Sequence, residues 1–573
     1  MKKSAKHFRG YLKETILSPL FKLCEATLEL IVPLIVANII DKGISNKDTG
    51  YIVTMCLVLV MLGVIGLALS LTAQYFAAKS AVGFTTSLKK ALFNHLESLS
   101  YKDIDILGTS TIITRMTTDS SRVQSGINLT LRLFLRSPFV VFGAMIMAFS
   151  IDPEAGLIFA ITIPLLAVVV FGVMLITTPM HGKVQGAVDR ILSRTRENLT
   201  GARVIRAFAQ EDNEKKEFYN ENSTLTNLQK NAGHFSALLN PLTFVIINVS
   251  ILALINIGAL KVDSGYLTQG EVIALYNYMG QILVELIKLA NLIVTISKAM
   301  ASLNRINSIL DIQSTQSFGN CELGDDSCKY TVEMTDVALQ YPTASENSIS
   351  DVNFKAERGQ VIGIIGGTGA GKTSLINLIP RLYDATNGVI KVFGRNISEY
   401  KKEFLCDKIS IVPQKAVLFS GTIRENMIWR KTNANDSEIM KALDIAQATD
   451  IVNAKGGLDA KIEAGGKNLS GGQRQRLTIA RALIGEPEIL ILDDSASALD
   501  FATDARLRSA INKLRKSTTL FIVSQRASSV LDADVIIVLD DGKISAVGSH
   551  SDLIKSCSIY REIYESQFGE VNE

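Results

Sequence analysis

Cysteine is scarce in this sequence, and its spacing excludes a cysteine-based metal site. The 573 residues contain six scattered cysteines, at Cys24, Cys56, Cys321, Cys328, Cys406 and Cys557. They do not form the close pairs that zinc and iron–sulfur sites use. Cys321 and Cys328 could form a disulfide, but we expect free thiols because the orientation argued below places both in the cytoplasm.

The chain also lacks a large excess of charge and a cleavable leader. Its formal net charge of +3 is too small to indicate a protein that binds nucleic acid. The first ten residues, Met1–Gly10, are basic and polar. Because they do not form a short apolar core before a small-residue cleavage site, we expect no cleaved signal peptide.

What the first half of the chain has in abundance is long apolar sequence. Crossing a bilayer takes about 20 mainly apolar residues. Six stretches qualify: Ile16–Ile40, Ile52–Ala78, Leu133–Ser150, Ala155–Thr177, Leu238–Leu260 and Glu271–Ile296. Short connections join the first to the second, the third to the fourth and the fifth to the sixth. Long, charged, helix-forming connections separate these pairs.

The distribution of basic residues predicts the orientation of the six spans. The long connections are rich in lysine and arginine, whereas the short ones carry only Lys42, Lys47 and Lys261. Basic loops stay in the cytoplasm. The N-terminus, both long connections and the C-terminal half are therefore expected on the cytoplasmic side of a multi-pass protein of the cell membrane.

Several ionisable residues lie inside the predicted spans, where charge is costly and usually faces a cavity or a partner. Glu285 and Lys288 are three residues apart on one helix face, so they either pair with each other or line a cavity. Glu25 and Glu29 also share a face but cannot neutralise each other. A contact with a polar or cationic substrate is one role open to them.

The second half of the chain carries a phosphate-binding motif in the required context. The apolar run Val361–Ile365 predicts a buried strand, which leads into a glycine loop and a helix. The loop consists of Gly366, Gly367, Thr368, Gly369, Ala370, Gly371, Lys372 and Thr373, followed by Ser374. Backbone N–H groups of such a loop surround phosphates. Lys372 is placed for the β- and γ-phosphates of ATP, and Thr373 for Mg²⁺.

Phosphate-binding loops of this kind occur in many nucleoside triphosphatases, and two further segments narrow the choice among them. The pentapeptide Leu469, Ser470, Gly471, Gly472 and Gln473 follows the loop, and the apolar run Ile489–Leu492 then ends at Asp493. Together with the loop they resemble the nucleotide-binding domain of ATP-binding-cassette (ABC) transporters. The six spans resemble the membrane half of ABC exporters, so the resemblance covers the chain from about Ile16 to Tyr564.

The resemblance implies a fold class and a domain plan. The fold is an all-α six-helix transmembrane domain with long cytoplasmic extensions, followed by an α/β P-loop ATP-binding domain. The transmembrane domain is expected over residues 1–312, a linker over 313–328 and the nucleotide-binding domain over 329–573. The tracts Asp103–Asp119 and Glu197–Phe208 correspond to the two cytoplasmic coupling loops.

The resemblance also implies roles for single residues. Tyr341 is the aromatic platform for adenine, and Gln414 contacts Mg²⁺ and the coupling helices. Asp493 holds Mg²⁺ together with Thr373. The segment Ser495–Asp500 communicates across a dimer through Asp500. Leu469–Gln473 completes the ATP site of a neighbouring chain rather than the site of its own.

Two positions depart from the family pattern. Asp494 follows the Mg²⁺ aspartate where a glutamate normally polarises the attacking water, and Gln525 replaces the switch histidine. A carboxylate displaced by about 1 Å can cost on the order of 10²-fold in rate. Glutamine cannot share a proton as imidazole does. We therefore expect this chain's own site to bind ATP with little hydrolysis.

The resulting hypothesis is one half of a heterodimeric, multidrug-type ABC exporter, a translocase ATPase that moves an amphiphilic small molecule, lipid or peptide out of the cytoplasm. A second half-transporter supplies the competent ATP site, which this chain's Leu469–Gln473 completes. Two alternatives stay open: a homodimeric exporter with slow ATPase activity, and an ATP-gated regulatory membrane subunit.

Overall fold

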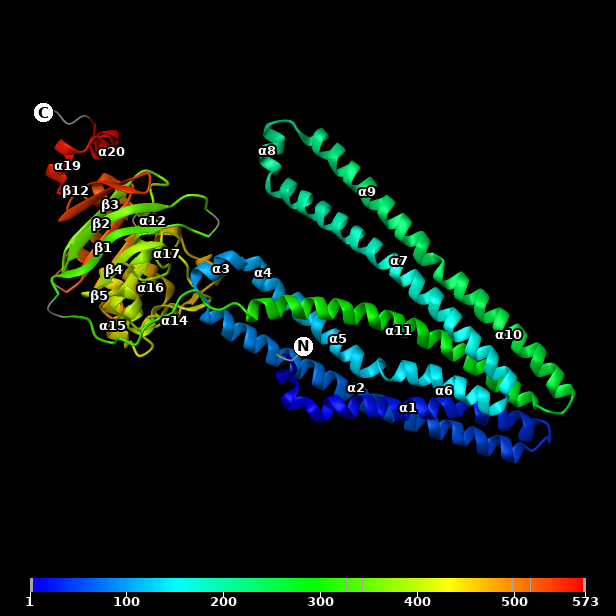
Figure 1. Ribbon diagram of the computed structural model, residues 1–573. Helices are drawn as coiled ribbons and strands as arrows, with labels where there is room; N and C mark the ends of the chain where they lie inside the picture. The colour runs from blue at the N-terminus through cyan, green and yellow to red at the C-terminus, as the bar shows by residue number, and fades with distance from the viewer. Residues whose placement is uncertain (1–3, 326–327, 343, 496–497, 516, 570–573) are drawn as a thin grey trace. The chain divides into compact units, whose positions relative to one another are not determined.

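A computed structural model describes the chain except residues 1–3, 326–327, 343, 496–497, 516 and 570–573 (Figure 1). The chain divides into two compact units. The helical unit comprises Met1–Glu97 and Ser110–Ile312, and the α/β unit comprises Ser98–Thr109 and Gln313–Glu573. Each unit is considered by itself below.

The helical unit confirms the expectation of six apolar spans. Within the described residues, six continuous helical stretches are long and apolar enough to cross a membrane: Lys6–Ile44, Thr49–Ser98, Thr109–Ile151, Pro153–Thr200, Glu211–Asp263 and Gln269–Leu310. At 1.5 Å per residue, the 50 residues of Thr49–Ser98 extend about 75 Å, well beyond a hydrocarbon core of about 30 Å. The helices therefore continue into water on at least one side.

The bounds of the helices within these stretches show where the chain turns. They are η1 (Ser4–Tyr11), α1 (Leu12–Asn38), η2 (Ile39–Ile44), α2 (Thr49–Ser98), α4 (Thr109–Thr114), η3 (Arg115–Asp119), α5 (Ser120–Leu133), α6 (Arg136–Ile151), α7 (Pro153–Thr200), α8 (Ala202–Ala207), α9 (Glu211–Ala237), α10 (Leu239–Asp263) and α11 (Gln269–Leu310).

Local sequence explains the sharp turns between paired spans. Asp152 caps α7 by accepting a hydrogen bond from the N–H of Ala155 at 2.8 Å, and Pro153 occupies the first turn, where no N–H is needed. Thr268 and Glu271 form a capping box at the start of α11. Lys261 Nζ lies 2.6 Å from Asp152 Oδ1, so the two turns are linked.

The ionisable side chains described below in the spans form ion pairs, two within a helix and two between helices. Lys22 Nζ lies 2.5 Å from Glu25 Oε2, and Arg136 contacts both Glu29 and Glu285. Of the two alternatives open for Glu285 and Lys288, their pairing is present, at 2.8 Å, and both residues also line a cavity. Glu25 and Glu29 are thus paired with Lys22 and Arg136, so neither carboxylate needs a net cationic substrate to neutralise it.

A second buried ion cluster lies in the helical unit near the start of α5. The Asp119 side chain is almost completely buried and accepts hydrogen bonds from Arg305 of α11 and from Arg115. Burial alone would raise the pKa of this carboxyl, but hydrogen bonds from Arg305, Ser302 and Arg115 lower the pKa to about 2. The cluster joins α11 to η3.

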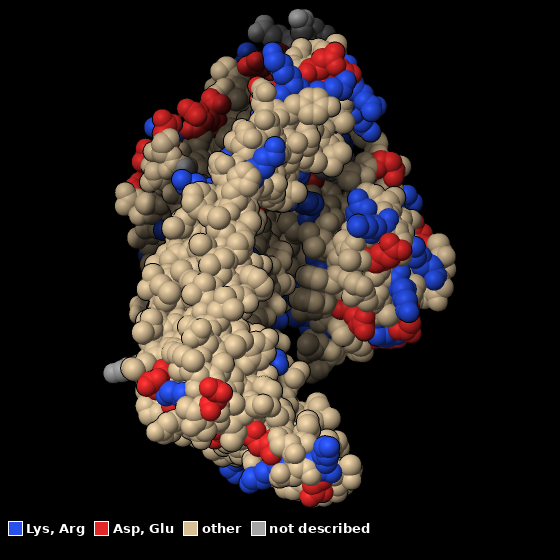
Figure 2. Space-filling view, turned by 90° about the vertical axis from the view of Figure 1, so that its right-hand side faces the viewer, with Lys and Arg blue, Asp and Glu red and all other residues tan. Residues whose placement is uncertain are grey.

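The outer surface of the helical unit is strongly apolar. The most apolar part of α2 has no buried residues, and large side chains such as Leu57, Val60 and Val64 are more than half exposed. Figure 2 shows a wide area without charged residues, with acidic and basic residues gathered near its ends. An apolar exterior of this extent is suited to lipid.

Within its described residues, the α/β unit contains three sheets. Its strands are β1 (Tyr330–Leu339), β2 (Ile349–Glu357), β3 (Val361–Gly366), β4 (Asn387–Val392), β5 (Arg395–Asn396), β6 (Ile409–Val412), β7 (Gly421–Thr422), β8 (Lys461–Ile462), β9 (Ile489–Asp493), β10 (Thr519–Ser524), β11 (Val535–Asp540) and β12 (Lys543–Gly548). The largest sheet has the order β12-β11-β3-β10-β9-β6 and is parallel except for β12.

Helices surround these sheets and connect their strands. They are α12 (Lys372–Leu378), η4 (Ile397–Glu399), α13 (Lys402–Lys408), α14 (Ile423–Met427), α15 (Asp436–Ile445), α16 (Thr449–Lys455), η5 (Ala464–Gly466), α17 (Gly471–Leu483), α18 (Phe501–Asn512), η6 (Ala527–Ser529), α19 (His550–Ser556) and α20 (Ser558–Phe568). Strands β3 and β9 are buried along their whole length, as the apolar runs predicted. The described cysteines are all free, which confirms the expectation for Cys321 and Cys328.

The short helix α3 (Tyr101–Leu107) belongs to the α/β unit although its sequence lies between two spans. Ser100 and Asp103 form a capping box at its start, and Asp103 Oδ2 also accepts a hydrogen bond from the N–H of Thr315 at 3.1 Å. The hydroxyl of Tyr383 donates to Asp105 at 2.5 Å. Helix α3 overlaps the start of the tract Asp103–Asp119, which is expected to form the first coupling loop.

Candidate functional site: a phosphate-loop cavity at the strand ends

Several of the predicted site residues come together where four parallel strands end. The glycine loop follows β3, Gln414 follows β6, Asp493 ends β9 and Gln525 follows β10. The carboxyl ends of parallel strands lie at one edge of a sheet, where ligands of α/β proteins bind. These segments line one cavity of about 340 Å³, a volume typical of small-molecule sites.

The glycine loop has the conformation that its sequence requires. Gly369 and Gly371 have φ values of +87° and +89°, a region that side chains disfavour. A Cβ at Gly371 would lie 2.7 Å from the carbonyl oxygen of Ser348, so that glycine is also sterically necessary. Gly367 and Gly369 have open space where a Cβ would project. A phosphate can therefore approach the backbone closely.

Lys372 is held inside the loop. Its ammonium donates to the carbonyl oxygens of Gly366 at 2.8 Å and Gly367 at 2.6 Å. Burial lowers the pKa of Lys372, and the nearby carboxylates of Asp494 and Asp493 oppose that shift. Phosphate oxygens near the loop would offer this ammonium charged acceptors in place of two carbonyls.

Thr373 and Asp493 form a pair of oxygen ligands suited to magnesium. The Thr373 hydroxyl lies 3.1 Å from Asp493 Oδ2, and Asp493 is only 4% exposed. Burial raises the pKa of Asp493, the Thr373 hydrogen bond lowers it, and Asp494 raises it again. Mg²⁺ usually takes one or two protein oxygens together with phosphates and waters. The residues present therefore fit the ion, with Gln414 at the same cavity.

Tyr341 lies close to this cavity but is not among the described residues of its wall. Its hydroxyl donates to Ser374 Oγ at 3.2 Å, and its ring lies 5.1 Å from that of Tyr383 in an edge-to-face arrangement. Because Tyr383 also contacts Asp105 of α3, an aromatic pair connects α3 to the first turn of α12. The role of Tyr341 as an adenine platform stays a prediction.

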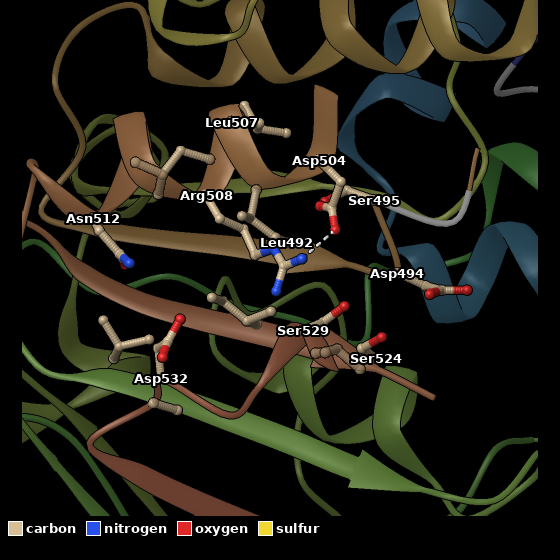
Figure 3. Close-up of a pocket in the computed structure, with 15 residues that line it drawn as sticks. Leu492, Asp494, Ser495, Asp504, Leu507, Arg508, Asn512, Ser524, Ser529 and Asp532 are labelled. Atoms are coloured by element: carbon tan, nitrogen blue, oxygen red, sulfur yellow. Dashed lines mark hydrogen bonds and ion pairs between the residues drawn. The ribbon is translucent and has the colours of Figure 1, made fainter. Parts of the chain in front are cut away.

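The two departures from the family pattern face the cavity together. Asp494 and Gln525 both line it. Asp494 has φ of +43°, an unusual value for a non-glycine residue, and its N–H donates to the carbonyl oxygen of Val523 at 2.9 Å. Asp494 also borders a small enclosed cavity beside the ion pair between Asp504 and Arg508 (Figure 3).

The pentapeptide Leu469–Gln473 lies elsewhere in the unit. Ser470 caps α17, accepting a hydrogen bond from the N–H of Gln473, while the Gln473 side chain accepts from the N–H of Ser470. Open space surrounds Gly471, whereas a Cβ at Gly472 would lie 3.1 Å from the carbonyl oxygen of Ala498. Among the described residues that line the phosphate-loop cavity, none belongs to this pentapeptide.

Asp500 caps a helix of its own chain. Its carboxylate accepts a hydrogen bond from the N–H of Thr503 at 2.9 Å and so caps α18. That hydrogen bond lowers the pKa of Asp500. Ala496 and Ser497, which belong to the segment Ser495–Asp500, lie outside the described residues. Communication across a dimer therefore stays a prediction for this segment.

Some residues at the site escaped sequence reasoning. Asn347, Ser348, Asp541 and Gly542 line the cavity although no motif marks them. The Asp-Gly pair signals a tight hairpin between β11 and β12, but not its place at a site. Gln567 of α20 was also not predicted; it is not among the described residues that line the cavity, but it contacts the segment that follows β10. Its side chain donates to the Gln525 carbonyl and accepts from the Ala527 N–H, both at 2.9 Å.

Comparisons with known proteins show the family to which the chain belongs. Residues 15–286 match the family described as ABC transporter transmembrane region, and residues 349–497 match the ABC transporter family. The chain is 33% identical to an uncharacterised ABC transporter ATP-binding protein, YfiB of Bacillus subtilis, over 99% of both chains. It is 30% identical to YheI of the same organism, described as a probable multidrug resistance ABC transporter, over 99% of this chain and 97% of YheI.

A solved structure shows the same fold over the full length. A bacterial Atm1-family ABC exporter with ATP bound superimposes with a TM-score of 0.79 and 21% sequence identity, covering 99% of this chain and all of that chain. The membrane spans, the phosphate-loop cavity and the full-length relatives lead to one conclusion. The chain belongs to the ABC transporter family, as a membrane exporter whose transmembrane and ATP-binding domains are fused.

Proposed function

We propose that this chain is the degenerate-site half of a heterodimeric ABC exporter. In this assignment its own phosphate-loop cavity binds ATP and hydrolyses it slowly. The pentapeptide Leu469–Gln473 completes the competent ATP site of a partner half-transporter. The pair moves an amphiphilic compound out of the cytoplasm across the cell membrane, with the N-terminus and the ATP-binding domain on the cytoplasmic side.

One observation carries the proposal: the residues at the two reaction positions are Asp494 and Gln525, and both line the cavity that holds Lys372 and Thr373. Aspartate is one methylene shorter than glutamate, and positioning errors of about 1 Å cost on the order of 10²-fold in rate. Glutamine can donate a hydrogen bond to a phosphate but cannot accept and return a proton at neutral pH.

The cavity is also incomplete within one chain. None of the described residues in its wall comes from Leu469–Gln473, so the backbone donors of such a segment would have to arrive from another chain. This chain's own pentapeptide begins α17 with open space at Gly471, which leaves room for a phosphate at a helix N-terminus. Head-to-tail pairing of two chains accounts for both facts.

Exposed apolar side chains support a second chain on the helical unit as well. Val204 of the short helix α8 and its neighbours Leu199 and Phe208 are 60%, 75% and 72% exposed. Large apolar groups gathered at a helical turn that is expected in water indicate a protein interface. The tract is the one that the sequence assigns to the second coupling loop.

The residues of this chain have defined tasks in the proposed cycle. Lys372 and the glycine loop hold the phosphates, while Thr373, Gln414 and Asp493 hold magnesium, which neutralises phosphate charge when bound. Ser470 and the N-terminus of α17 contact the γ-phosphate bound by the partner. Helix α3 responds to closure, because Tyr383 connects it to the region of the loop.

The decisive experiment compares two variants in the purified pair reconstituted in lipid. Asp494→Ala should leave ATPase turnover within about twofold of the unchanged pair. Ser470→Arg should lower turnover by at least about 10²-fold, because it removes transition-state donors from the competent site. A collapse of turnover in the Asp494→Ala pair would contradict the degenerate-site assignment.

A second measurement separates the alternatives. Reconstituted alone, this chain should show little ATPase activity. Robust turnover without a partner would instead establish the homodimeric exporter in which Asp494 acts as a weak base. ATP-dependent uptake of an amphiphile into inverted vesicles by the pair would exclude a regulatory subunit that binds nucleotide without transport.

A further inference from the structure

A cavity of about 480 Å³ lies in the helical unit, between α1 and α11. Its wall is part apolar and part polar. Val32, Val36 and Val284 supply hydrocarbon surface, whereas Glu29, Gln281 and Lys288 supply charge and amide groups. A pocket that combines an apolar wall with a few polar groups is the usual form of a site for a small ligand.

Four side chains of alternating charge form a continuous row of ion pairs beside this cavity. Arg136 Nη2 lies 2.5 Å from Glu29 Oε2, and Arg136 Nη1 lies 2.6 Å from Glu285 Oε1. The same Glu285 oxygen lies 2.8 Å from Lys288 Nζ. The order Glu29–Arg136–Glu285–Lys288 therefore begins with a carboxylate, ends with an ammonium and has no net charge.

The two inner charges are buried, and both oxygens of Glu285 are engaged, whereas the buried Nε of Arg136 has no hydrogen-bond acceptor among the described residues. The side chains of Arg136 and Glu285 are 8% and 3% exposed. Besides its two cationic partners, Glu285 accepts a hydrogen bond from Ser137 Oγ at 2.7 Å. Both of its oxygens are thus occupied, and these two residues are built into the packing between α6 and α11.

The two outer charged residues, unlike the two inner ones, are partly exposed to the cavity. Glu29 and Lys288 are 40% and 41% exposed, and both line the cavity. No described residue other than Arg136 donates to the Glu29 carboxylate, and none other than Glu285 accepts from the Lys288 ammonium. The buried side-chain oxygen of Gln281 accepts no hydrogen bond from the described part of the chain. The wall thus offers one anionic and one cationic end with unused capacity.

Electrostatics selects among ligands that could enter. A charge brought into a low-dielectric site is costly unless an opposite charge compensates it. Because the four charges already sum to zero, a net cation or a net anion would leave the site with uncompensated charge. A zwitterion places its cation near Glu29 and its anion near Lys288, so the total stays zero.

We infer that this cavity binds the headgroup of a zwitterionic amphiphile, its ammonium toward Glu29 and its anionic group toward Lys288, with the apolar part along the valines. The inference rests on the exporter function proposed above and names the chemistry of its substrate. The headgroup could belong to a membrane lipid or to a soluble single-chain amphiphile.

The test uses the full pair in nanodiscs of phosphatidylglycerol without ATP. Radiolabelled dodecylphosphocholine, below its micellar concentration, is displaced by unlabelled dodecylphosphocholine, dodecyltrimethylammonium or dodecyl phosphate, which share one tail length. Empty nanodiscs give the background. The zwitterion should compete at least about tenfold better than either charged compound, the size expected for one charge-assisted contact. Equal competition by all three would overturn the inference.

Two variants give opposite, directional results. Glu29→Gln leaves the site with a net positive charge and should shift the preference to dodecyl phosphate. Lys288→Met leaves a net negative charge and should shift it to dodecyltrimethylammonium. Glu25→Gln is the matched control, because Glu25 is also an intramembrane carboxylate, paired with Lys22, but does not line the cavity. Unchanged preferences in both cavity variants would contradict the site.

Repeating the measurement in phosphatidylcholine nanodiscs distinguishes the two sources. If dodecylphosphocholine binds more weakly in phosphatidylcholine, the zwitterionic lipid competes for the site and is its occupant. If binding is unchanged, the site exists and its occupant is a soluble amphiphile. ATPase turnover is measured on the same samples. A pair that discriminates headgroups but fails the Asp494 and Ser470 comparison would contradict the proposed function and leave the binding site standing.

Discussion

The two units of this protein differ in how their sequence specifies their important residues. In the α/β unit they come from short contiguous segments, such as Gly366–Thr373 and Leu469–Gln473, each placed at the end of a strand or the start of a helix. In the helical unit the key contacts join residues that are far apart: Arg136 is 107 residues from Glu29 and 149 from Glu285. Motifs identify the first kind of residue, and only tertiary structure identifies the second.

We expect the largest effect on stability from removing Arg136, the residue at the centre of the contacts between distant segments of the helical unit. Arg136→Met removes the cation between Glu29 and Glu285, which leaves Glu29 without its described partner and the buried Glu285 with only Lys288 and Ser137. Losing one member of a buried ion pair costs about 3–5 kcal/mol. We expect a strong loss of thermal stability of the pair in detergent. Adding Glu29→Gln and Glu285→Gln to that variant should recover most of it, and no recovery would show that packing rather than charge is responsible.

Asp119 tests the same principle outside the spans. Asp119→Asn weakens charge-assisted hydrogen bonds to Arg305 and Arg115, at an expected cost of about 1.5–3 kcal/mol in unfolding free energy. The matched control is Asp189→Asn, an exposed aspartate whose described partner is Gln185. The control should unfold like the unchanged protein.

The pH dependence at Asp119 has a definite sign. The folded pKa is lowered to about 2 from an ordinary value of 3.8, so the ionised carboxylate favours the folded state. Its contribution is fully present above the ordinary value and is lost as the pH falls toward 2. The stability difference between the unchanged protein and Asp119→Asn should therefore be constant between pH 8 and pH 5 and shrink below about pH 4. A difference that peaks near neutral pH would implicate another group.

In the α/β unit, two variants of Tyr341 separate the contribution of its aromatic ring from that of its hydroxyl. Stacking a base on an aromatic ring contributes about 1–3 kcal/mol. Tyr341→Ala should weaken ATP labelling of this chain by about five- to a hundredfold. Tyr341→Phe keeps the ring and loses only the hydrogen bond to Ser374, so it should stay close to the unchanged protein. Equal losses in both variants would assign the effect to the hydroxyl.

The smallest effect concerns Gln567, which holds the switch segment from outside the cavity. Gln567→Ala removes two hydrogen bonds, each worth about 0.5–1.5 kcal/mol, to Gln525 and Ala527. Hydrogen exchange at the Ala527 amide should become faster. Gln567→Glu can still accept from that amide but cannot donate to the Gln525 carbonyl, so it should keep most of the protection. Unaltered exchange in Gln567→Ala would contradict this role.

Sequence reasoning succeeded where local rules decide the structure. Apolar runs predicted the six spans, because a helix that crosses lipid needs about 20 apolar residues, and the strands β3 and β9, because a strand buried on both faces needs a continuous apolar run. The glycine loop was predictable because left-handed backbone at Gly369 and Gly371 and close approach of a ligand need glycine.

The remainder depended on contacts between distant segments. The third predicted span contains Arg136, yet nothing in the sequence shows that it lies between Glu29 and Glu285. Helix α3 follows a membrane helix in sequence but packs in the α/β unit through Asp103 and Asp105. Gln567 lies 42 residues from Gln525, on a helix without any motif. Such pairings follow from the packing of whole elements, which periodicity and spacing do not encode.

The arginine between two carboxylates also bears on how the membrane half is made. Spans leave the ribosome in order, so Glu29 enters the bilayer before Arg136, and Glu285 enters last. An arginine at the centre of a lone span costs about 2.5–3.5 kcal/mol on insertion scales, and Arg136, the first residue of α6, lies nearer the end of its span, where the cost is smaller. The first span therefore supplies a counter-ion as soon as the third arrives, whereas the sixth must arrive before the arginine is fully paired. Insertion of this protein should thus be a cooperative process, in which the last helix completes the accommodation of the third.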